Sequence, residues 1–395
     1  MQTGRLVTFI GYFGIVLLIV LITLKKQKSE KEFVLGSRGL NFWLTALSAH
    51  ASDMSQWLFL AYPMAIYLAG VFEAWTAIGL TVFMYLNWQF IAPKIRVATE
   101  KTNSLTLNAY FENRYKDSSG VIRILSALMT FIFYTFYISS GLVAMGFLVE
   151  SLFGMNYHLG ISFGLILVAF YVFIGGYSTV AWIDLFQGFF LLAVLLYIPF
   201  HLLAGIGEMG LVMEKVRSLG LTTSLLPDFS VNTILGALVI MLGWGPGYFG
   251  QPHIITKFMG IKKVEEIKKA KYLGMSWQIL ALIAATFIGL IGIYLFPEKI
   301  QDPSKIVLAI ATNYLNPFLV GLVLCAILAA TTNVMAAQIL VVASSMSEDF
   351  YKRWICKNAS SKALLHVSRA SVLLISALAY IVAFFKLSTI YELVL

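Results

Sequence analysis

The stretch Leu44–Pro63, LTALSAHASDMSQWLFLAYP, indicates the kind of protein this chain is. It has the length and the apolar flanks of a membrane-spanning helix, yet its middle holds small residues, a histidine and the carboxylate of Asp53. A carboxylate at that depth is costly unless it faces a protein interior or a water-filled cavity. Small and polar residues inside a span are also typical of discontinuous helices, whose unwound backbone binds an ion or a substrate. We therefore expect a ligand site here; an aspartate that only packs against a neighbouring helix is the alternative.

The composition places the chain in a broad class. Of its 395 residues, 59% are hydrophobic and 12% are charged, and the charged share is about half that of a soluble globular protein. We predict an all-α polytopic membrane protein that forms a single transmembrane domain over residues 1–395. Leu6–Leu24 lacks a small-residue cleavage site and is interpreted as a retained anchor.

Several apolar segments are long enough to cross a bilayer, which takes about 20 residues in a helix. We count ten, at approximately residues 5–24, 40–69, 72–93, 124–151, 158–176, 179–207, 231–256, 272–296, 308–346 and 366–385.

The distribution of lysine and arginine predicts the orientation of these spans. With the N-terminus outside, the inside loops carry 21 of these residues and the outside segments carry 6. This bias accounts for the net charge of +9 without a nucleic-acid partner, and residues 262–271 are expected to contact lipid headgroups. The inside loops are residues 25–39, 94–123, 257–271 and 352–362.

A second interruption lies at Gly243–Pro252, GWGPGYFGQP, where four glycines and two prolines fall within ten residues. Such a density breaks a helix and frees backbone groups for other partners. The two interrupted spans stand five helices apart, which predicts inverted five-helix repeats with a binding site where the breaks meet. The repeats are placed at about 40–207 and 231–395; the second is expected to be incomplete, with an eleventh span only beginning at Ser388–Leu395.

Two further polar features lie inside predicted spans. Ala330, Asn333 and Val334 share one helical face in the ninth span and could approach the first break, although close packing of helices is an equal alternative. Asp184 lies near the inner end of the sixth span. It is a candidate for an ion exit, and exposure at the interface is the alternative.

The sequence shows no pattern of an enzyme. Its histidines lack metal-ligand spacing to one another or to cysteine. It has no phosphate-binding glycine loop, so ATP is not the expected energy source. A transporter without a nucleotide site is a facilitator or is driven by an ion gradient.

Six stretches, taken together, carry a resemblance to a known family. The chain resembles the sodium/solute symporter family, and within it the bacterial sodium/proline symporters. The resemblance implies an inverted-repeat fold and coupling of sodium entry to uptake of a small solute. The stretches are TALSAHASDMSQW, LTLNAYFENRY, FIGGYSTVAWIDLFQ, GWGPGYFGQPHI, AILAATTNVMAAQ and MSEDFYKRW, in the order of the family.

The resemblance also implies site residues. Sodium would be bound by the backbone carbonyls of Ala51, Met54 and Ala330 and by two side chains of the ninth span, at Asn333 and Val334. Asn333 offers a carbonyl oxygen, as a hard cation prefers, whereas valine offers none. Proline would be bound by residues around both breaks and on the fourth span, namely Asp53, Ser55, Trp57, Tyr137, Trp244 and Tyr248.

Two functions from different classes follow. The first is sodium-coupled uptake of proline or a similar small solute across a bacterial cytoplasmic membrane, with sodium co-transported. Gln56 stands where the proline symporters usually have glycine, which adds bulk beside the expected cavity. The second is a non-transporting membrane protein of the same fold, either a remnant or a sensor that binds the solute.

Overall fold

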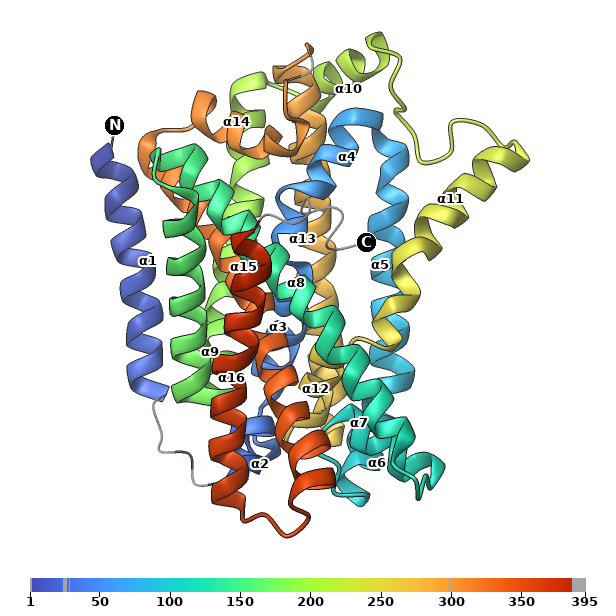
Figure 1. Ribbon diagram of the computed structural model, residues 1–395. Coiled ribbons are helices and arrows are strands. Elements are labelled where there is room, and N and C mark those ends of the chain that lie inside the picture. Colours follow the sequence, from blue (N-terminus) through green and yellow to red (C-terminus); the bar gives the residue numbers. More distant parts are fainter. Residues whose placement is uncertain (1, 24–26, 28, 299, 386–395) are drawn as a thin grey trace.

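The computed structural model describes residues 2–23, 27, 29–298 and 300–385, and over these residues the chain is a bundle of helices (Figure 1). In that part of the chain, seven helices are long and apolar enough to cross a membrane, judged by length and composition. The prediction of an all-α polytopic membrane protein is therefore confirmed.

The N-terminal helix, α1 (Gln2–Thr23), lies at one side of the bundle. The short helices α2 (Glu30–Leu35) and η1 (Gly36–Arg38) follow at the lower end in Figure 1. The Ser29 hydroxyl caps α2 by accepting a hydrogen bond from the amide of Glu32.

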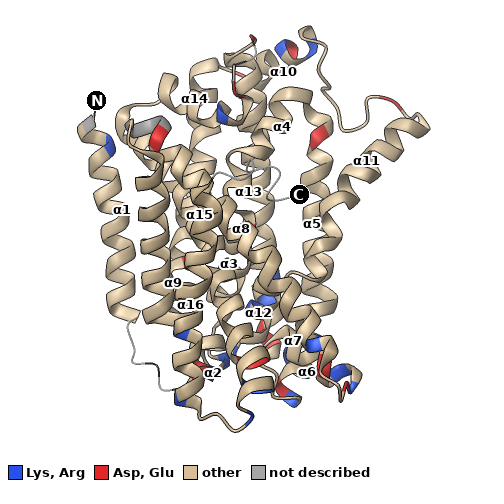
Figure 2. Cartoon of the chain, viewed as in Figure 1, with Lys and Arg blue, Asp and Glu red and all other residues tan. Residues whose placement is uncertain are grey.

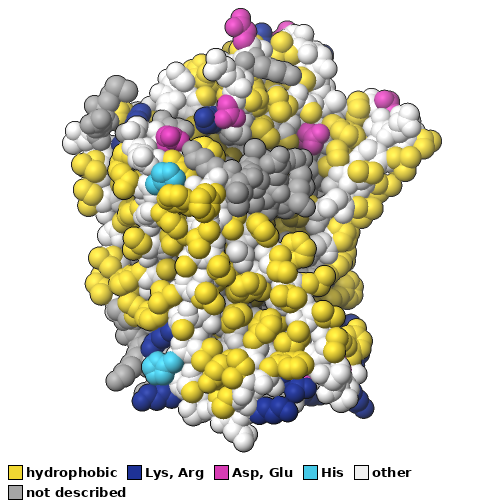
Figure 3. Space-filling model, viewed as in Figure 1, with side chains coloured by type: hydrophobic (Ala, Val, Ile, Leu, Met, Phe, Trp, Pro, Cys, Tyr) yellow, Lys and Arg dark blue, Asp and Glu magenta, His cyan; other side chains and the backbone are white. Residues whose placement is uncertain are grey.

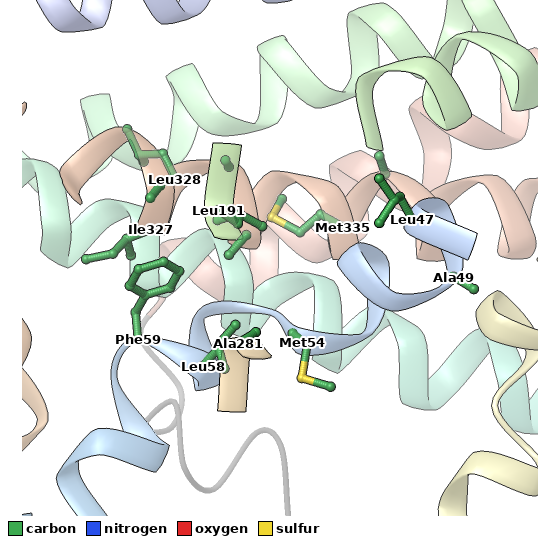
Figure 4. Close-up of a cluster of buried hydrophobic side chains, with 14 of the residues drawn as sticks. Leu47, Ala49, Met54, Leu58, Phe59, Leu191, Ala281, Ile327, Leu328 and Met335 are labelled. Carbon is green, nitrogen blue, oxygen red and sulfur yellow. The ribbon is translucent and has the colours of Figure 1, made fainter. Parts of the chain in front are cut away.

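The first interrupted span has its break where the sequence predicts it. Helix α3 (Phe42–Met54) ends at Ser55, whose φ of 45° and ψ of −169° are not helical. The chain continues as η2 (Gln56–Leu58) and α4 (Ala61–Ala69), and the Ser55 hydroxyl accepts a hydrogen bond from the amide of Trp57. Figure 4 shows side chains of this segment in the buried core beside α15.

The next elements lead away from this break. They are η3 (Val71–Ala74), α5 (Trp75–Leu86), the π-helical η4 (Asn87–Ile91), α6 (Ala92–Lys101), α7 (Leu107–Tyr115) and α8 (Val121–Phe153).

Helix α9 (Tyr157–Ile206) has 50 residues and would be about 75 Å long if it were straight. Its backbone leaves the helical conformation at Gly176, where φ is 57° and ψ is −154°. A Cβ at Gly176 would lie 2.8 Å from the ring of Phe33, so glycine is needed both for the backbone and for the space. The predicted fifth and sixth spans are the two arms of α9.

The second half of the chain repeats the pattern of an interrupted span. Helix α11 (Val231–Trp244) ends in the 3₁₀ segment η5 (Gly245–Phe249), and α12 (Pro252–Gly260) follows. The other elements are α10 (Met209–Ser218), η6 (Val264–Glu266), α13 (Ile267–Leu295), η7 (Pro303–Lys305), α14 (Ile306–Tyr314), α15 (Pro317–Ser345), the π-helical η8 (Met346–Ile355) and α16 (Ser361–Phe384).

The predicted ninth span, 308–346, is two helices. The chain leaves α14 at Leu315, and Asn316 caps α15 by accepting a hydrogen bond from the amide of Leu319. Helix α15 contacts α1, α3, α8 and α9 and is buried along most of its length, so it is the central helix of the bundle.

The charged side chains gather at the two ends of the bundle. Figure 2 shows Lys and Arg concentrated at the lower end, around α2, α6 and α7, and Figure 3 shows hydrophobic side chains over much of the middle of the visible face. This distribution suits a protein that crosses a bilayer. Three of the lysines in the first inside loop and the predicted start of an eleventh span, Ser388–Leu395, lie outside the described residues.

Candidate functional site

The two interrupted spans touch through a pair of side chains. Asp53 lies in the last turn of α3, and Tyr248 lies in η5. The Tyr248 hydroxyl donates a hydrogen bond to Asp53 Oδ2 over 2.5 Å. A carboxylate inside a membrane span is costly without a partner, and the second break supplies that partner for Asp53.

Aromatic rings extend the contact between the breaks. The ring of Trp57 stacks on that of Tyr62, with centroids 5.0 Å apart, and lies 5.7 Å from that of Trp244. Trp57 and Trp244 remain partly exposed. Together they form an apolar wall with two indole donors, which suits a small amphipathic ligand.

Helix α8 adds a third side to this cluster. The phenol of Tyr137 hydrogen-bonds the side chain of Ser55, the residue at which α3 ends. The structure thus brings the six predicted substrate residues into one cluster formed by three segments distant in sequence. Whether they bind a solute stays a prediction.

Two residues that support the cluster were not predicted. Asn87, at the start of the π-helical η4, donates a hydrogen bond to the carbonyl of Tyr248 over 2.8 Å and so holds the second break. The Tyr62 hydroxyl hydrogen-bonds Thr286 of α13 over 2.7 Å. An asparagine inside an apolar span is a signal that could have pointed to Asn87, because such a group needs a partner.

The predicted sodium ligands lie on α3 and α15, two helices that contact each other. Ala51, Met54, Ala330 and Asn333 are all buried. Neither polar atom of the Asn333 amide has a hydrogen-bond partner within the described residues. A buried amide without a partner is rare in native proteins, so the Asn333 oxygen is suited to coordinate a cation.

The threonines before Asn333 make hydrogen bonds within α15. Thr331 and Thr332 donate their hydroxyl hydrogens to the carbonyls of Ile327 and Leu328 one turn earlier in α15. Val334 is buried and has no side-chain oxygen. The oxygens predicted for a cation site are therefore the carbonyls of Ala51, Met54 and Ala330 and the amide of Asn333.

The alternative that Asp184 is exposed at the interface is wrong. Its side chain is fully buried, accepts a hydrogen bond from the Ser48 hydroxyl, and pairs with Lys257 Nζ over 2.9 Å. Lys257 was predicted in an inside loop, but it lies in α12 and is 1% exposed. The sequence could not reveal this pair, because 73 residues separate the two partners.

A small cavity adjoins Lys257. Its volume is about 10 Å³, roughly that needed for one water molecule. It lies between α2, α9, α12 and α15 and is lined by Val34, Tyr177, His253, Thr256, Lys257, Ala337, Leu340, Val341 and Ser344.

A charged cluster joins two of the stretches that carried the resemblance. Asp349 of η8 accepts hydrogen bonds from Thr106 and Asn108 at the start of α7, at 2.7 and 2.8 Å, and from Arg123 at 2.7 Å. Burial raises the pKa of Glu112 in α7, but hydrogen bonds from Arg353 and Arg123 lower that pKa more, so it lies below its usual value. The cluster fastens α7, α8 and η8 together at the end of the bundle that is rich in Lys and Arg.

Two discontinuous helices that meet at a carboxylate beside buried backbone carbonyls are the architecture of secondary transporters. Residues 33–395 match the model of the Sodium:solute symporter family. The chain belongs to this family.

Curated relatives support the same assignment. The chain is 37% identical to the high-affinity proline transporter PutP of Bacillus subtilis, over 96% of this chain and 80% of that protein. It is 37% identical to the sodium/proline symporter of Escherichia coli, over 97% and 77%. It is 36% identical to the osmoregulated proline transporter OpuE of Bacillus subtilis, over 97% and 78%.

Solved structures confirm the fold. An outward-open, substrate-bound Na⁺-coupled sialic acid symporter matches 97% of this chain and 82% of its own, with a TM-score of 0.84 and 16% sequence identity. The nucleobase-cation-symport-1 family transporter Mhp1, in a closed conformation, matches 94% and 77%, with a TM-score of 0.52 and 15% identity. The predicted symporter fold with broken helices is confirmed; the bounds of the two repeats stay a prediction.

Proposed function

We propose that the protein is a symporter that couples sodium entry to the uptake of proline or a similar small solute. The observation that carries this proposal is the junction of the two interrupted helices at Asp53 and Tyr248. The buried amide of Asn333, which has no hydrogen-bond partner within the described residues, also supports it. The proline-transporting relatives support the choice of solute.

The solute site is proposed at the aromatic cluster. Trp57 and Trp244 would enclose the apolar ring of proline, and Tyr137 would donate a hydrogen bond to its carboxylate, while the Tyr248 hydroxyl holds Asp53 in place. Asp53 would accept hydrogen bonds from the secondary ammonium group. The site also includes Ser55, whose backbone ends α3.

The ion site is proposed between α3 and α15. The carbonyls of Ala51 and Met54 belong to the last turn of α3, where helical carbonyls lack intrahelical partners. With the carbonyl of Ala330 and the amide oxygen of Asn333, they form a set of neutral oxygens that a hard cation prefers. Asp184 of α9 accepts a hydrogen bond from Ser48, which precedes these ligands in α3. Asp184 is proposed to lie on the path by which sodium leaves.

The energy source is proposed to be the sodium gradient, with no ATP and no enzymatic step. The concentration of Lys and Arg at the end that holds α2, α6 and α7 supports the placement of that end in the cytoplasm. The N-terminus would then lie outside, in a bacterial cytoplasmic membrane, with residues 262–271 near lipid headgroups.

Equilibrium binding of labelled proline to purified protein tests this proposal. Sodium should raise the affinity for proline when it replaces potassium at constant ionic strength, and proline should raise the affinity for sodium by the same factor. Proline binding that is indifferent to sodium would contradict the coupling. Sodium-dependent binding without uptake into vesicles would favour the sensor of the same fold.

A further inference from the structure

The ion pair between Lys257 and Asp184 connects both interrupted spans to α9. Lys257 lies in α12, the helix that follows the second break, and Asp184 lies in α9. Ser48 of α3, the helix that precedes the first break, donates a hydrogen bond to the same carboxylate oxygen that Lys257 contacts. The pair therefore lies where both broken spans meet the arm of α9 that follows Gly176.

The pair lies close to the proposed ion ligands. A Cβ built on Gly188 of α9 would lie 3.5 Å from the Cβ of Ala51, so these two residues face each other. Asp184 precedes Gly188 by four residues in α9, and Ser48 precedes Ala51 by three residues in α3. Asp184 and Ser48 therefore lie about one turn before the Gly188–Ala51 approach, on the same facing sides of the two helices. One helical turn is about 5.4 Å along the axis. The carboxylate of Asp184 is thus about one turn from the carbonyl of Ala51.

A continuous face of α15 runs from the proposed ion ligands past the pair. Asn333, Ala337, Val341 and Ser344 are spaced by three or four residues and share one side of the helix. The last three line the small cavity, and Lys257 also lines it. Val34 of α2 also lines this cavity, and α2 lies at the end of the bundle that carries the Lys and Arg side chains.

The second carboxylate oxygen of Asp184 remains available. Asp184 Oδ1 is buried and has no hydrogen-bond partner within the described residues. A buried carboxylate without a compensating cation would attract sodium strongly, because a charge interaction is weakly screened in a protein interior. The ammonium of Lys257 supplies that compensation at 2.9 Å.

We propose that Lys257 is a positioning residue that neutralises Asp184 so that sodium, after leaving its site between α3 and α15, passes this carboxylate without being retained. This inference rests on the proposed function. The lysine acts as a tethered cation that occupies the carboxylate between transport events. Sodium passing along the face of α15 then meets a neutral pair, and its release to the cytoplasm is fast.

The effect of removing each charge has a defined sign. In Lys257→Met the carboxylate is uncompensated, so sodium should bind about tenfold or more tightly and the maximal uptake rate should fall, because release becomes slow. In Asp184→Asn the ammonium is unpaired and should repel sodium, so sodium binding should weaken about tenfold or more. Lys257→Arg keeps the charge and should remain close to the wild type.

The experiment measures equilibrium binding of ²²Na⁺ to purified protein in lipid nanodiscs, together with the sodium dependence of uptake in proteoliposomes. The double variant Lys257→Met/Asp184→Asn has no charge at the pair and should return sodium affinity to within about threefold of the wild type. A merely structural role of the pair would lower the yield of folded protein, but it would not strengthen sodium binding in one variant and weaken it in the other.

Sodium affinity in folded Lys257→Met that equals or falls below the wild-type value would overturn the inference. If Lys257→Met does not fold, equal sodium affinity in Asp184→Asn and the double variant would overturn it equally. If the wild type binds sodium, either of these results leaves the proposed function intact. A wild type that binds no sodium overturns the proposed function and this inference with it.

Discussion

Tyr248 donates a hydrogen bond of 2.5 Å to Asp53 and so joins the two interrupted helices directly. Asp53 is 195 residues away in sequence, at the end of α3. A movement of one broken span relative to the other would break this bond, because its two partners belong to different broken spans. The bond therefore ties residues of the proposed solute site to the relative position of the two broken helices.

Asp53→Asn is expected to abolish solute uptake while leaving membrane insertion intact. The amide is similar in size, but it lacks the charge that the proposed ammonium contact needs. Uptake of labelled proline at equal membrane abundance measures this effect. Asp228→Asn, in an exposed loop before α11, is the matched control and should transport normally. Wild-type uptake in Asp53→Asn would show the carboxylate to be dispensable.

Trp244→Ala and Tyr248→Ala are each expected to weaken solute binding by about 1–3 kcal/mol, the scale of a lost aromatic contact. Tyr248→Phe keeps the ring and removes only the hydrogen bond to Asp53, so comparison with Tyr248→Ala separates the two contributions. Isotope displacement from purified protein measures the affinities. Unchanged affinity in both alanine variants would place the solute site elsewhere.

Val334→Thr is expected to lower the sodium concentration for half-maximal uptake by roughly 5- to 150-fold. The substitution is nearly isosteric and adds one oxygen to the proposed ion site, and an unmet polar contact is worth about 1–3 kcal/mol. A salt series at constant ionic strength measures the change. Val323→Thr, equally buried in α15 but more than two turns away, should have no such effect. If Val334→Thr behaves like Val323→Thr, this part of α15 is not the ion site.

Glu30 is expected to make the stability of the folded protein depend on pH. Burial and the neighbouring carboxyl of Glu348 raise the pKa of Glu30 to about 8. Because the folded state holds the proton more tightly than the unfolded state, stability falls as pH rises from the unfolded pKa to about 8. The difference in melting temperature between Glu30→Gln and the wild type should therefore grow from pH 5 to pH 8 in favour of the variant. Glu265→Gln, at an exposed position, is the control and should show the same change of melting temperature with pH as the wild type. If Glu30→Gln also shows the wild-type change, Glu30 is not the group responsible.

Gly176→Ala is expected to destabilise the protein by about 1–3 kcal/mol, the cost of an alanine held in a sparsely populated backbone conformation. The new Cβ would also meet Phe33, whose ring lies 2.8 Å from that position. Thermal unfolding in detergent measures the loss. Gly205→Ala, in the same helix with open space around it, should be neutral or stabilising.

The breaks and most spans could be predicted because they depend on local composition. Ser55 follows a run of small residues, and the glycines and prolines of Gly243–Pro252 cannot sustain a helix, so both signals are contained in about ten residues. The departure from helical conformation at Gly176 falls at the boundary between the predicted spans 158–176 and 179–207. The boundary at Asn316–Pro317 was missed although Asn-Pro is a turn signal, because long apolar runs flank it on both sides.

The pairing of polar side chains across the bundle could not be predicted. Lys257 is followed in the sequence by the basic residues 262–271, and only the folded structure shows that its ammonium is buried against Asp184. Asn87 and Tyr62 support the site through partners in other helices. Their roles depend on contacts between residues more than 150 positions apart in sequence, which a single sequence does not record.

Uptake of labelled proline into proteoliposomes tests the central claim most directly. The measurement compares an inward sodium gradient, equal sodium on both sides, and potassium in place of sodium, each with and without an ionophore that dissipates the sodium gradient. The account predicts accumulation above the external proline concentration only with the inward sodium gradient, and its loss on addition of the ionophore. Accumulation that is the same in all three conditions, or proline that never exceeds its external concentration, would contradict sodium-coupled symport.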